Sequence, residues 1–128
     1  MTDRSAKIAA QNDAFRKGFG PCVHTPEGQE KEVLKGWVFI TPGVEALPVA
    51  EQRRLVRRVR GSRRFPEGDN PNGERDFLSL RVRTNEGIRR AYFKIDYYAD
   101  GRLIYGSDDP ANPDKTYRVG TLLMASEY

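Results

Sequence analysis

The sequence is poor in the residues that build covalent and metal-bound sites, because it contains one cysteine, Cys22, and one histidine, His24. A single cysteine excludes an intramolecular disulfide, which is typical of a reducing cytoplasm. One cysteine and one histidine cannot complete a closed zinc site, and the pair lacks a third group that would orient a nucleophile. We therefore expect neither a zinc centre nor a Cys/His catalytic pair.

Long apolar runs are also missing. The longest falls far short of the ~18 residues that a membrane-spanning helix needs, and the first residues are polar and charged, unlike a secretion signal. A Gly-rich phosphate loop and a Gly-x-Ser-x-Gly nucleophile motif are both absent. These absences predict a cytoplasmic protein without membrane contact or a bound cofactor, and they favour a binding protein over an enzyme.

What the sequence does have is a clear strand pattern in residues 91–98, where apolar and polar side chains alternate. Alternation of this kind predicts a half-buried β-strand. The same pattern occurs at 77–83, where Leu78, Leu80 and Val82 share one face. The residues Asn85, Glu86 and Gly87 lie between the two segments and predict a tight hairpin turn.

The remaining elements follow from periodicity and turn residues. Helices are predicted at 4–17 and from Leu47-Pro48 to Gly61, and strands at 33–41, 103–105 and 116–125, with loops at 22–32, 61–76 and 106–115. The last strand is almost continuously apolar, which predicts a central place in the sheet. We expect a single α+β domain over 1–128, with a mainly antiparallel sheet of about five strands and two helices packed on one face. Residues 1–20 form its N-terminal helix and arm, and residues 33–128 its sheet and arginine-rich helix.

Six spaced blocks carry a resemblance: residues 12–16 (NDxFR), 41–48 (TxGVxALP), 69–77 (DNPxGExDF), 94–98 (KIDYY), 106–113 (GSxDPAxP) and 116–128 (TxRV, then EY). With them the chain resembles an uncharacterised bacterial domain-of-unknown-function family of short proteins that are often encoded on plasmids and other mobile elements. Its members usually have a histidine where this chain has Arg75, so any chemistry of that histidine is missing here. The resemblance implies a mobile-element setting and no particular activity.

The most unusual feature is a run of positive charge in residues 53–64, which contain arginines and no acidic residue. Helical spacing places Arg53, Arg57 and Arg60 on one face, with Arg54 and Arg58 beside them. Like charges repel, and a partner that carries phosphates or carboxylates would remove the repulsion. The alternative is a solvated face, or pairing with glutamates of the same chain. The complete set is Arg53, Arg54, Arg57, Arg58, Arg60, Arg63 and Arg64.

A second candidate is the polar face of the predicted sheet, where basic and aromatic side chains alternate. Such a surface is typical of proteins that stack single-stranded bases on aromatic rings. The alternative is ordinary sheet packing, with Lys94 and Asp96 forming ion pairs. The residues of this face are Arg81, Arg83, Tyr92, Lys94, Asp96 and Tyr98.

A third candidate is a set of carboxylates in two polar loops and one strand, which could hold a divalent metal for hydrolysis. The alternative is that Asp and Asn stand before Pro or Gly because turns require them. The set comprises Asp69, Glu74, Asp76, Asp96, Asp108 and Asp109, of which the first four are the metal candidates.

The leading hypothesis is a small non-enzymatic binding or accessory protein. Its arginine-rich helix, with Arg81, Tyr92 and Lys94, would contact nucleic acid or the surface of an acidic or nucleic-acid-handling protein. By resemblance it would be an accessory protein of a mobile element, and interference with host defence is one hypothesis for its use. The alternative is a metal-dependent hydrolase or nuclease that uses the Asp/Glu loops.

Overall fold

A computed structural model describes residues 3–63, 65 and 70–128. The helices are α1 (Asp3–Gly18), α2 (Pro42–Glu45) and α3 (Val49–Gly61), with two short 3₁₀ helices, η2 (Pro113–Lys115) and η3 (Ala125–Glu127). The strands are β1 (Cys22–His24), β2 (Glu32–Ile40), β3 (Phe77–Thr84), β4 (Gly87–Tyr98) and β5 (Tyr117–Met124).

The strands form one sheet in the order β1-β2-β5-β4-β3. All neighbours are antiparallel except β2 and β5, which run parallel. The predicted α+β class with a mainly antiparallel sheet is therefore confirmed, and β5 lies at its centre as its apolar sequence indicated. The hairpin between β3 and β4 closes at Thr84 and Gly87, where the Thr84 hydroxyl donates a hydrogen bond to the Gly87 carbonyl at 2.8 Å.

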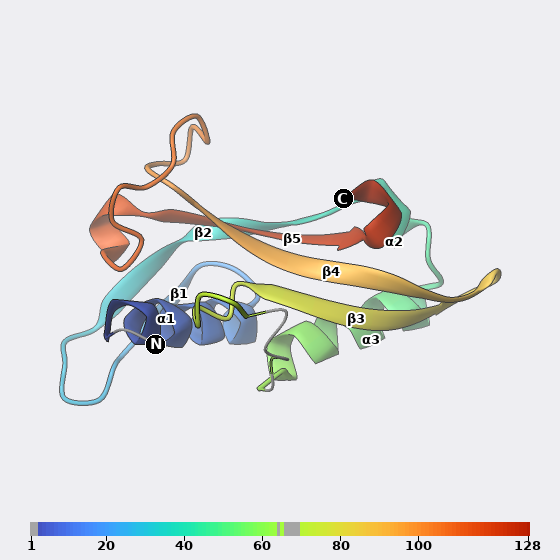
Figure 1. The fold of residues 1–128 in the computed structure, drawn as a ribbon, viewed down its shortest axis with the longest axis horizontal. Helices are drawn as coiled ribbons and strands as arrows, with labels where there is room; N and C mark the ends of the chain where they lie inside the picture. The colour runs from blue at the N-terminus through green and yellow to red at the C-terminus, as the bar shows by residue number, and fades with distance from the viewer. Residues whose placement is uncertain (1–2, 64, 66–69) are drawn as a thin grey trace.

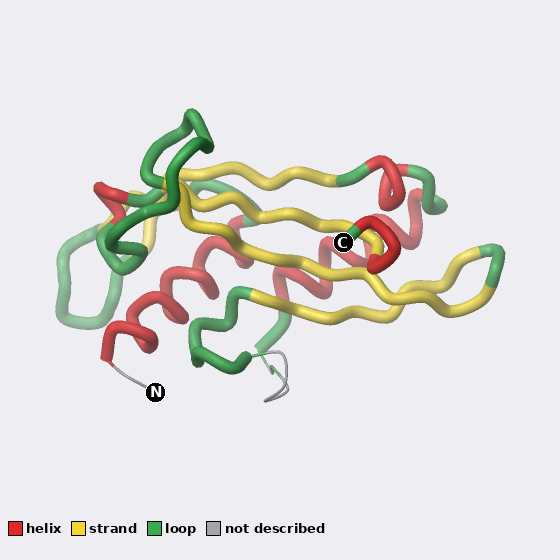
Figure 2. Tube along the Cα trace, turned by 45° about the horizontal axis from the view of Figure 1, so that its top comes forward, coloured by secondary structure: helices red, strands yellow, loops and turns green. Residues whose placement is uncertain are grey.

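Both long helices lie on the same face of the sheet (Figures 1 and 2), so the core forms between α1, α3 and the inward side chains of β3, β4 and β5. The inward residues of β4, Ala91, Phe93 and Ile95, are buried, as the alternation predicts. None of the described helices combines the length and the apolar character that crossing a bilayer would require.

Two glycines allow α1 to approach the sheet closely. A Cβ atom at Gly36 would lie 2.1 Å from the carbonyl oxygen of Arg118 and 2.9 Å from the Phe15 ring. A Cβ atom at Gly120 would lie 2.6 Å from the Phe93 ring and 3.2 Å from that of Phe15. The missing side chains therefore leave the space in which Phe15 anchors α1.

Arg118 is fully buried on the inward face of β5 and is held by amide groups of α1. Its Nε donates to the Asn12 side-chain oxygen at 2.9 Å, and its Nη2 donates to that of Gln11 at 2.7 Å. The guanidinium also lies 5.4 Å from the centre of the Tyr97 ring. Burial lowers the pKa of Arg118, because desolvation disfavours its charged form.

Arg16, also buried, lies one turn further along α1. It pairs with Asp13, donates to the Arg75 carbonyl at 2.7 Å and covers the Phe65 ring at 4.6 Å. The 12–16 block thus supplies three of the buried residues of α1, Asn12, Phe15 and Arg16, and Ile8, Ala9 and Gln11 supply the rest. Polar side chains supply much of this buried surface, which explains why the apolar stripe of this helix is thin.

Three local predictions differ from the structure. Residues 103–105 do not form a strand, because the Arg102 amide donates to the Asp100 carboxylate at 2.9 Å and the turn leaves Leu103 at a φ of 58°. Residues 22–32 were expected to be a loop, yet Cys22–His24 forms β1 against β2. The turn at Pro42 continues into α2, which adds a helix to the two expected.

Candidate functional site: an arginine-rich helix beside an apolar groove

Helix α3 begins one residue after Pro48, whose carbonyl accepts a hydrogen bond from the Glu51 amide at 2.9 Å. Its Leu55 and Val59 are buried against the sheet, and Val56 packs against the core from the side. The two buried residues are four positions apart, as the helical period requires. This stripe turns the helix so that every arginine of α3 is exposed: Arg53, Arg54, Arg57, Arg58 and Arg60.

Some of these arginines bind backbone atoms of their own chain. Arg58 donates to the Arg81 carbonyl at 2.7 Å and ties α3 to β3. Arg60 donates to the Lys17 carbonyl at 2.9 Å and ties α3 to the end of α1. Arg54 lies 3.8 Å from Glu51, at the limit of an ion pair. These three contacts are structural, although the charges stay exposed.

Three other arginines are different. Among the residues that the structure describes, Arg53, Arg57 and Arg63 have no hydrogen-bond or ion-pair partner. Their charge is therefore not neutralised within the described part of the chain. Arg64, the last member of the predicted set, lies outside the described residues.

The ends of α1 and α3 enclose a basic hollow of about 470 Å³. Among the described residues, its cations are Lys17, Arg60, Arg63 and Arg75, and its acid is Asp13. Arg75 pairs with Asp13 at 2.7 Å, so part of the charge is compensated. Sequence reasoning did not place Lys17 and Arg75 here, because no spacing rule connects α1 to the loop before β3.

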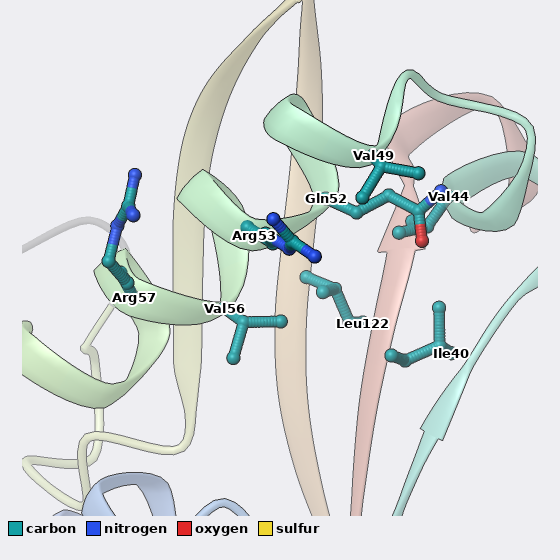
Figure 3. A pocket seen from close by; sticks show the side chains of 8 residues that line it. All are labelled: Ile40, Val44, Val49, Gln52, Arg53, Val56, Arg57 and Leu122. Carbon is teal, nitrogen blue, oxygen red and sulfur yellow. The ribbon is translucent and has the colours of Figure 1, made fainter.

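An apolar groove of about 430 Å³ lies on the other side of α3, between the helix and the ends of β2 and β5 (Figure 3). The Arg53 side chain reaches over this groove toward Leu122, and Arg57 lies one turn further along α3. The groove therefore combines an apolar floor with a cationic rim. Its lining residues are Ile40, Val44, Val49, Gln52, Arg53, Val56, Arg57 and Leu122.

The outward face of the sheet carries the second predicted set of residues. No described helix of more than one turn covers this face (Figure 1). Tyr92 packs between the rings of Phe77 at 4.9 Å and Tyr128 at 5.7 Å, so it belongs to an aromatic cluster. Lys94 pairs with Asp96 at 2.9 Å, and this hydrogen bond raises the pKa of Lys94. Arg81 is exposed four residues after Phe77 on the same face of β3, and its register partner on β4 is Arg90.

The carboxylates are dispersed. Glu74 accepts a hydrogen bond from the Tyr97 hydroxyl at 3.1 Å, Asp96 pairs with Lys94, and Asp109 lies 3.6 Å from Arg4. Burial raises the pKa of Asp76, and the nearby charge of Asp96 acts in the same direction. Within the described residues, no three His, Cys, Asp or Glu side chains gather where they could hold a metal ion. Asp69 lies outside the described part of the chain.

Comparison with known proteins places most of the chain in a protein family. Residues 40–127 match the family described as protein of unknown function (DUF3768). The chain belongs to this family. The DUF3768 match contains α3, β3, β4 and β5 and every residue that lines the apolar groove, whereas α1 lies before it. No curated protein and no solved structure matches the chain.

Proposed function

We propose that this chain is a non-enzymatic binding protein that uses α3 to hold an anionic macromolecule, either an acidic protein surface or nucleic acid. One observation carries the proposal: Arg53, Arg57 and Arg63 are exposed and have no partner among the described residues. Neighbouring guanidinium groups repel one another, and carboxylates or phosphates that bridge them would relieve this repulsion.

Of the two partners, an acidic protein segment fits the arginines better. The groove beside Arg53 is lined by Ile40, Val44 and Leu122, which favour an apolar side chain over a hydrated phosphate backbone. A polypeptide can present an apolar residue and a carboxylate within the same few residues. Nucleic acid would instead use the basic hollow at Lys17 and Arg63, where fewer apolar groups are present.

We further propose that the protein acts in the bacterial cytoplasm as an accessory factor of a mobile element. The resemblance described for the spaced sequence blocks supports this setting. A factor that interferes with host defence would bind an acidic or nucleic-acid-handling host protein, and an exposed arginine surface is suited to such a partner.

The proposal is tested by fluorescence anisotropy with two labelled probes, polyglutamate and a single-stranded oligonucleotide of similar length. We expect the wild-type chain to bind polyglutamate, and the Arg53→Glu, Arg57→Glu and Arg63→Glu triple variant to bind it at least about tenfold more weakly. Exposed charge pairs contribute about 0.2–1 kcal/mol each, so three of them account for roughly this factor.

A matched control carries Arg83→Glu, Arg89→Glu and Arg102→Glu, which change the net charge equally on other exposed residues. This control should bind polyglutamate almost as well as the wild type. Preferential binding of the oligonucleotide that depends on the α3 arginines would assign the surface to nucleic acid. Equal losses in the two triple variants, or no binding to either probe, would contradict the proposal.

A further inference from the structure

The strand β2 is an edge strand over most of its length, because β1 covers only its first three residues. The strand β1 pairs with β2 at Glu32, Val33 and Leu34. From Lys35 to Ile40, β2 pairs only with β5 among the described residues. Natural proteins protect such edges with charged residues, prolines or bulges, because an open edge pairs readily with another chain. In residues 35–40, the one charged side chain is that of Lys35.

The open part of β2 is also apolar on both faces. Trp37 and Phe39 point outward and are 55% and 46% exposed. Val38 and Ile40 point inward and are only partly buried, with Ile40 at the wall of the apolar groove. An apolar, unprotected edge of this kind is typical of a surface that another polypeptide covers.

The backbone of β2 has hydrogen-bonding groups that face this edge. The Thr41 amide points toward β5, because it donates to the Leu122 carbonyl at 3.1 Å. The backbone groups of successive residues in a strand point to opposite sides, so this bond fixes the direction of the others. Odd-numbered residues therefore bond toward β5, and the N–H and C=O groups of Val38 and Ile40 point to the open side. An extended peptide can satisfy these groups, whereas a nucleic acid or a lipid cannot continue the ladder.

The groove lies under the inward face of β2 and β5, and the Arg53 side chain reaches over it (Figure 3). A strand added beside β2 would direct alternate side chains inward, toward α3, because successive side chains face opposite sides of a sheet. One such side chain would enter the groove between Ile40, Val56 and Leu122. An inward side chain two residues away would extend along the groove toward Arg53, which reaches over it (Figure 3).

We propose that the open edge of β2 and the groove beneath it bind an extended, acidic segment of another protein as an additional strand of the sheet. The segment carries a large apolar residue that fills the groove and an Asp or Glu two residues away that meets Arg53. This inference rests on the proposed function, which it deepens by naming the form and the chemistry of the acidic partner.

A second copy of this chain fits the edge less well. Two copies paired through β2 would bring the Arg53 side chains of both molecules toward the same interface, together with both Lys35 side chains. Repulsion between these cations disfavours that dimer, whereas carboxylates in the added strand would neutralise them.

The experiment uses phage-displayed random peptides of about twelve residues, selected against the full chain. We expect enriched sequences to share an apolar residue and an acidic residue two positions apart. A synthetic copy of one enriched peptide is then N-methylated at one amide after another. If the peptide adds as a strand, binding is lost at alternate amides, because only every second amide donates to β2. Loss without this alternation would overturn the strand model.

Two variants of equal exposure test the groove. Val49 lines the groove and is 60% exposed, whereas Val33 lies on the outward face of β2 and is 61% exposed. We expect Val49→Trp to fill the groove and weaken the selected peptide at least about tenfold, and Val33→Trp to change its affinity less than about twofold. Equal effects of the two variants would contradict the groove as the binding site.

The outcomes separate this inference from the proposed function. If the α3 triple variant loses polyglutamate binding but no selected peptide shows the alternating pattern, the proposed function stands and the added strand is wrong. If the alternating pattern appears but the α3 charges have no effect, the edge binds peptides and the proposed function fails. A dimer of the free chain that Val38→Pro converts to a monomer would assign the edge to a second copy and overturn the inference.

Discussion

The protein contains two sets of arginines whose surroundings differ. Arg16 on α1 and Arg118 on β5 are buried between α1 and the elements it packs against, and oxygen acceptors and aromatic rings surround them. Arg53 and Arg57 lie on the exposed side of α3 and bind nothing in the described part of the chain. The buried set fastens α1 to the sheet, and we assign the exposed set to a partner.

This difference shows that charge alone does not indicate the role of an arginine here. A guanidinium in the interior needs hydrogen-bond acceptors, because an unpaired charge is expensive to bury. Most donors of Arg16 and Arg118 have them, although Arg16 Nε and Arg118 Nη1 have none in the described part of the chain. An exposed guanidinium has water as a partner, so its position is free to serve binding. The two sets should therefore respond in opposite ways when stability and binding are measured separately.

The largest effect is expected at Asn12, whose side chain accepts from Arg118 and donates to the Tyr97 hydroxyl at 2.7 Å. Asn12→Ala deprives the Nε of the buried Arg118 of its acceptor and the Tyr97 hydroxyl of a donor, and we expect the free energy of unfolding to fall by about 3 kcal/mol. Urea denaturation measures it. Arg118→Met should cost less, because it removes the charge together with the contact. A loss below about 1 kcal/mol for Asn12→Ala would show that Arg118 does not depend on Asn12.

The next effect concerns Tyr97, whose hydroxyl lies in the same network. Burial raises the pKa of Tyr97, and the nearby charge of Asp76 raises it further. Tyrosines of the unfolded chain titrate near pH 10, so the folded state should lose stability as the pH rises above about 10. Tyr97→Phe should cost about 1 kcal/mol at neutral pH and reduce this alkaline loss. Urea unfolding midpoints measured between pH 8 and 11 would test this prediction. Midpoints that fall in parallel for the wild type and Tyr97→Phe would contradict it.

A smaller effect is expected at Glu127, which joins η3 to the start of α2. Its carboxylate accepts from the Thr41 hydroxyl at 2.7 Å and from the amides of Gly43 and Met124 at 2.9 Å each. These hydrogen bonds lower the pKa of Glu127, and the hydrogen bond from Thr41 has the largest effect. The stabilisation is therefore present at neutral pH and is lost as the pH falls through the lowered pKa. Glu127→Ala should flatten the stability curve below pH 5, and an unchanged acid limb would argue against this role.

The smallest effect on stability is expected on α3. The triple variant of Arg53, Arg57 and Arg63 removes no described contact, so its free energy of unfolding should stay within about 0.5 kcal/mol of the wild type. Reduced repulsion could even raise it slightly. A loss of more than about 2 kcal/mol would show that these arginines support the fold, and the contrast with Arg118 would fail.

Much of the fold could be predicted from the sequence, because its signals are local. Alternation places β3 and β4, the spacing of Leu55 and Val59 gives the buried side of α3, and continuous apolarity gives the central place of β5. The strand β1 and the parallel pairing of β2 with β5 were missed. Both depend on contacts between segments far apart in the chain, which no local pattern reports.

The candidate site was predictable in part for the same reason. The arginines of α3 are visible as a run, and their exposure follows from the helix period. The groove was not predictable, because Ile40, Val44 and Leu122 come from three elements that meet only in the folded chain. The apolar run from Trp37 to Ile40 was a weak sequence signal for the groove, because such a run occurs both in protein cores and at interfaces.

The central claim is that the exposed arginines of α3 serve a partner and not the fold. Its most direct measurement is the affinity for labelled polyglutamate as a function of salt, for the wild type and for the triple variant of Arg53, Arg57 and Arg63. Screening weakens exposed charge pairs, so we expect the wild-type affinity to fall steeply with salt, and the variant to bind weakly at every salt concentration. Equal affinities and equal salt dependence for the two proteins would contradict the claim.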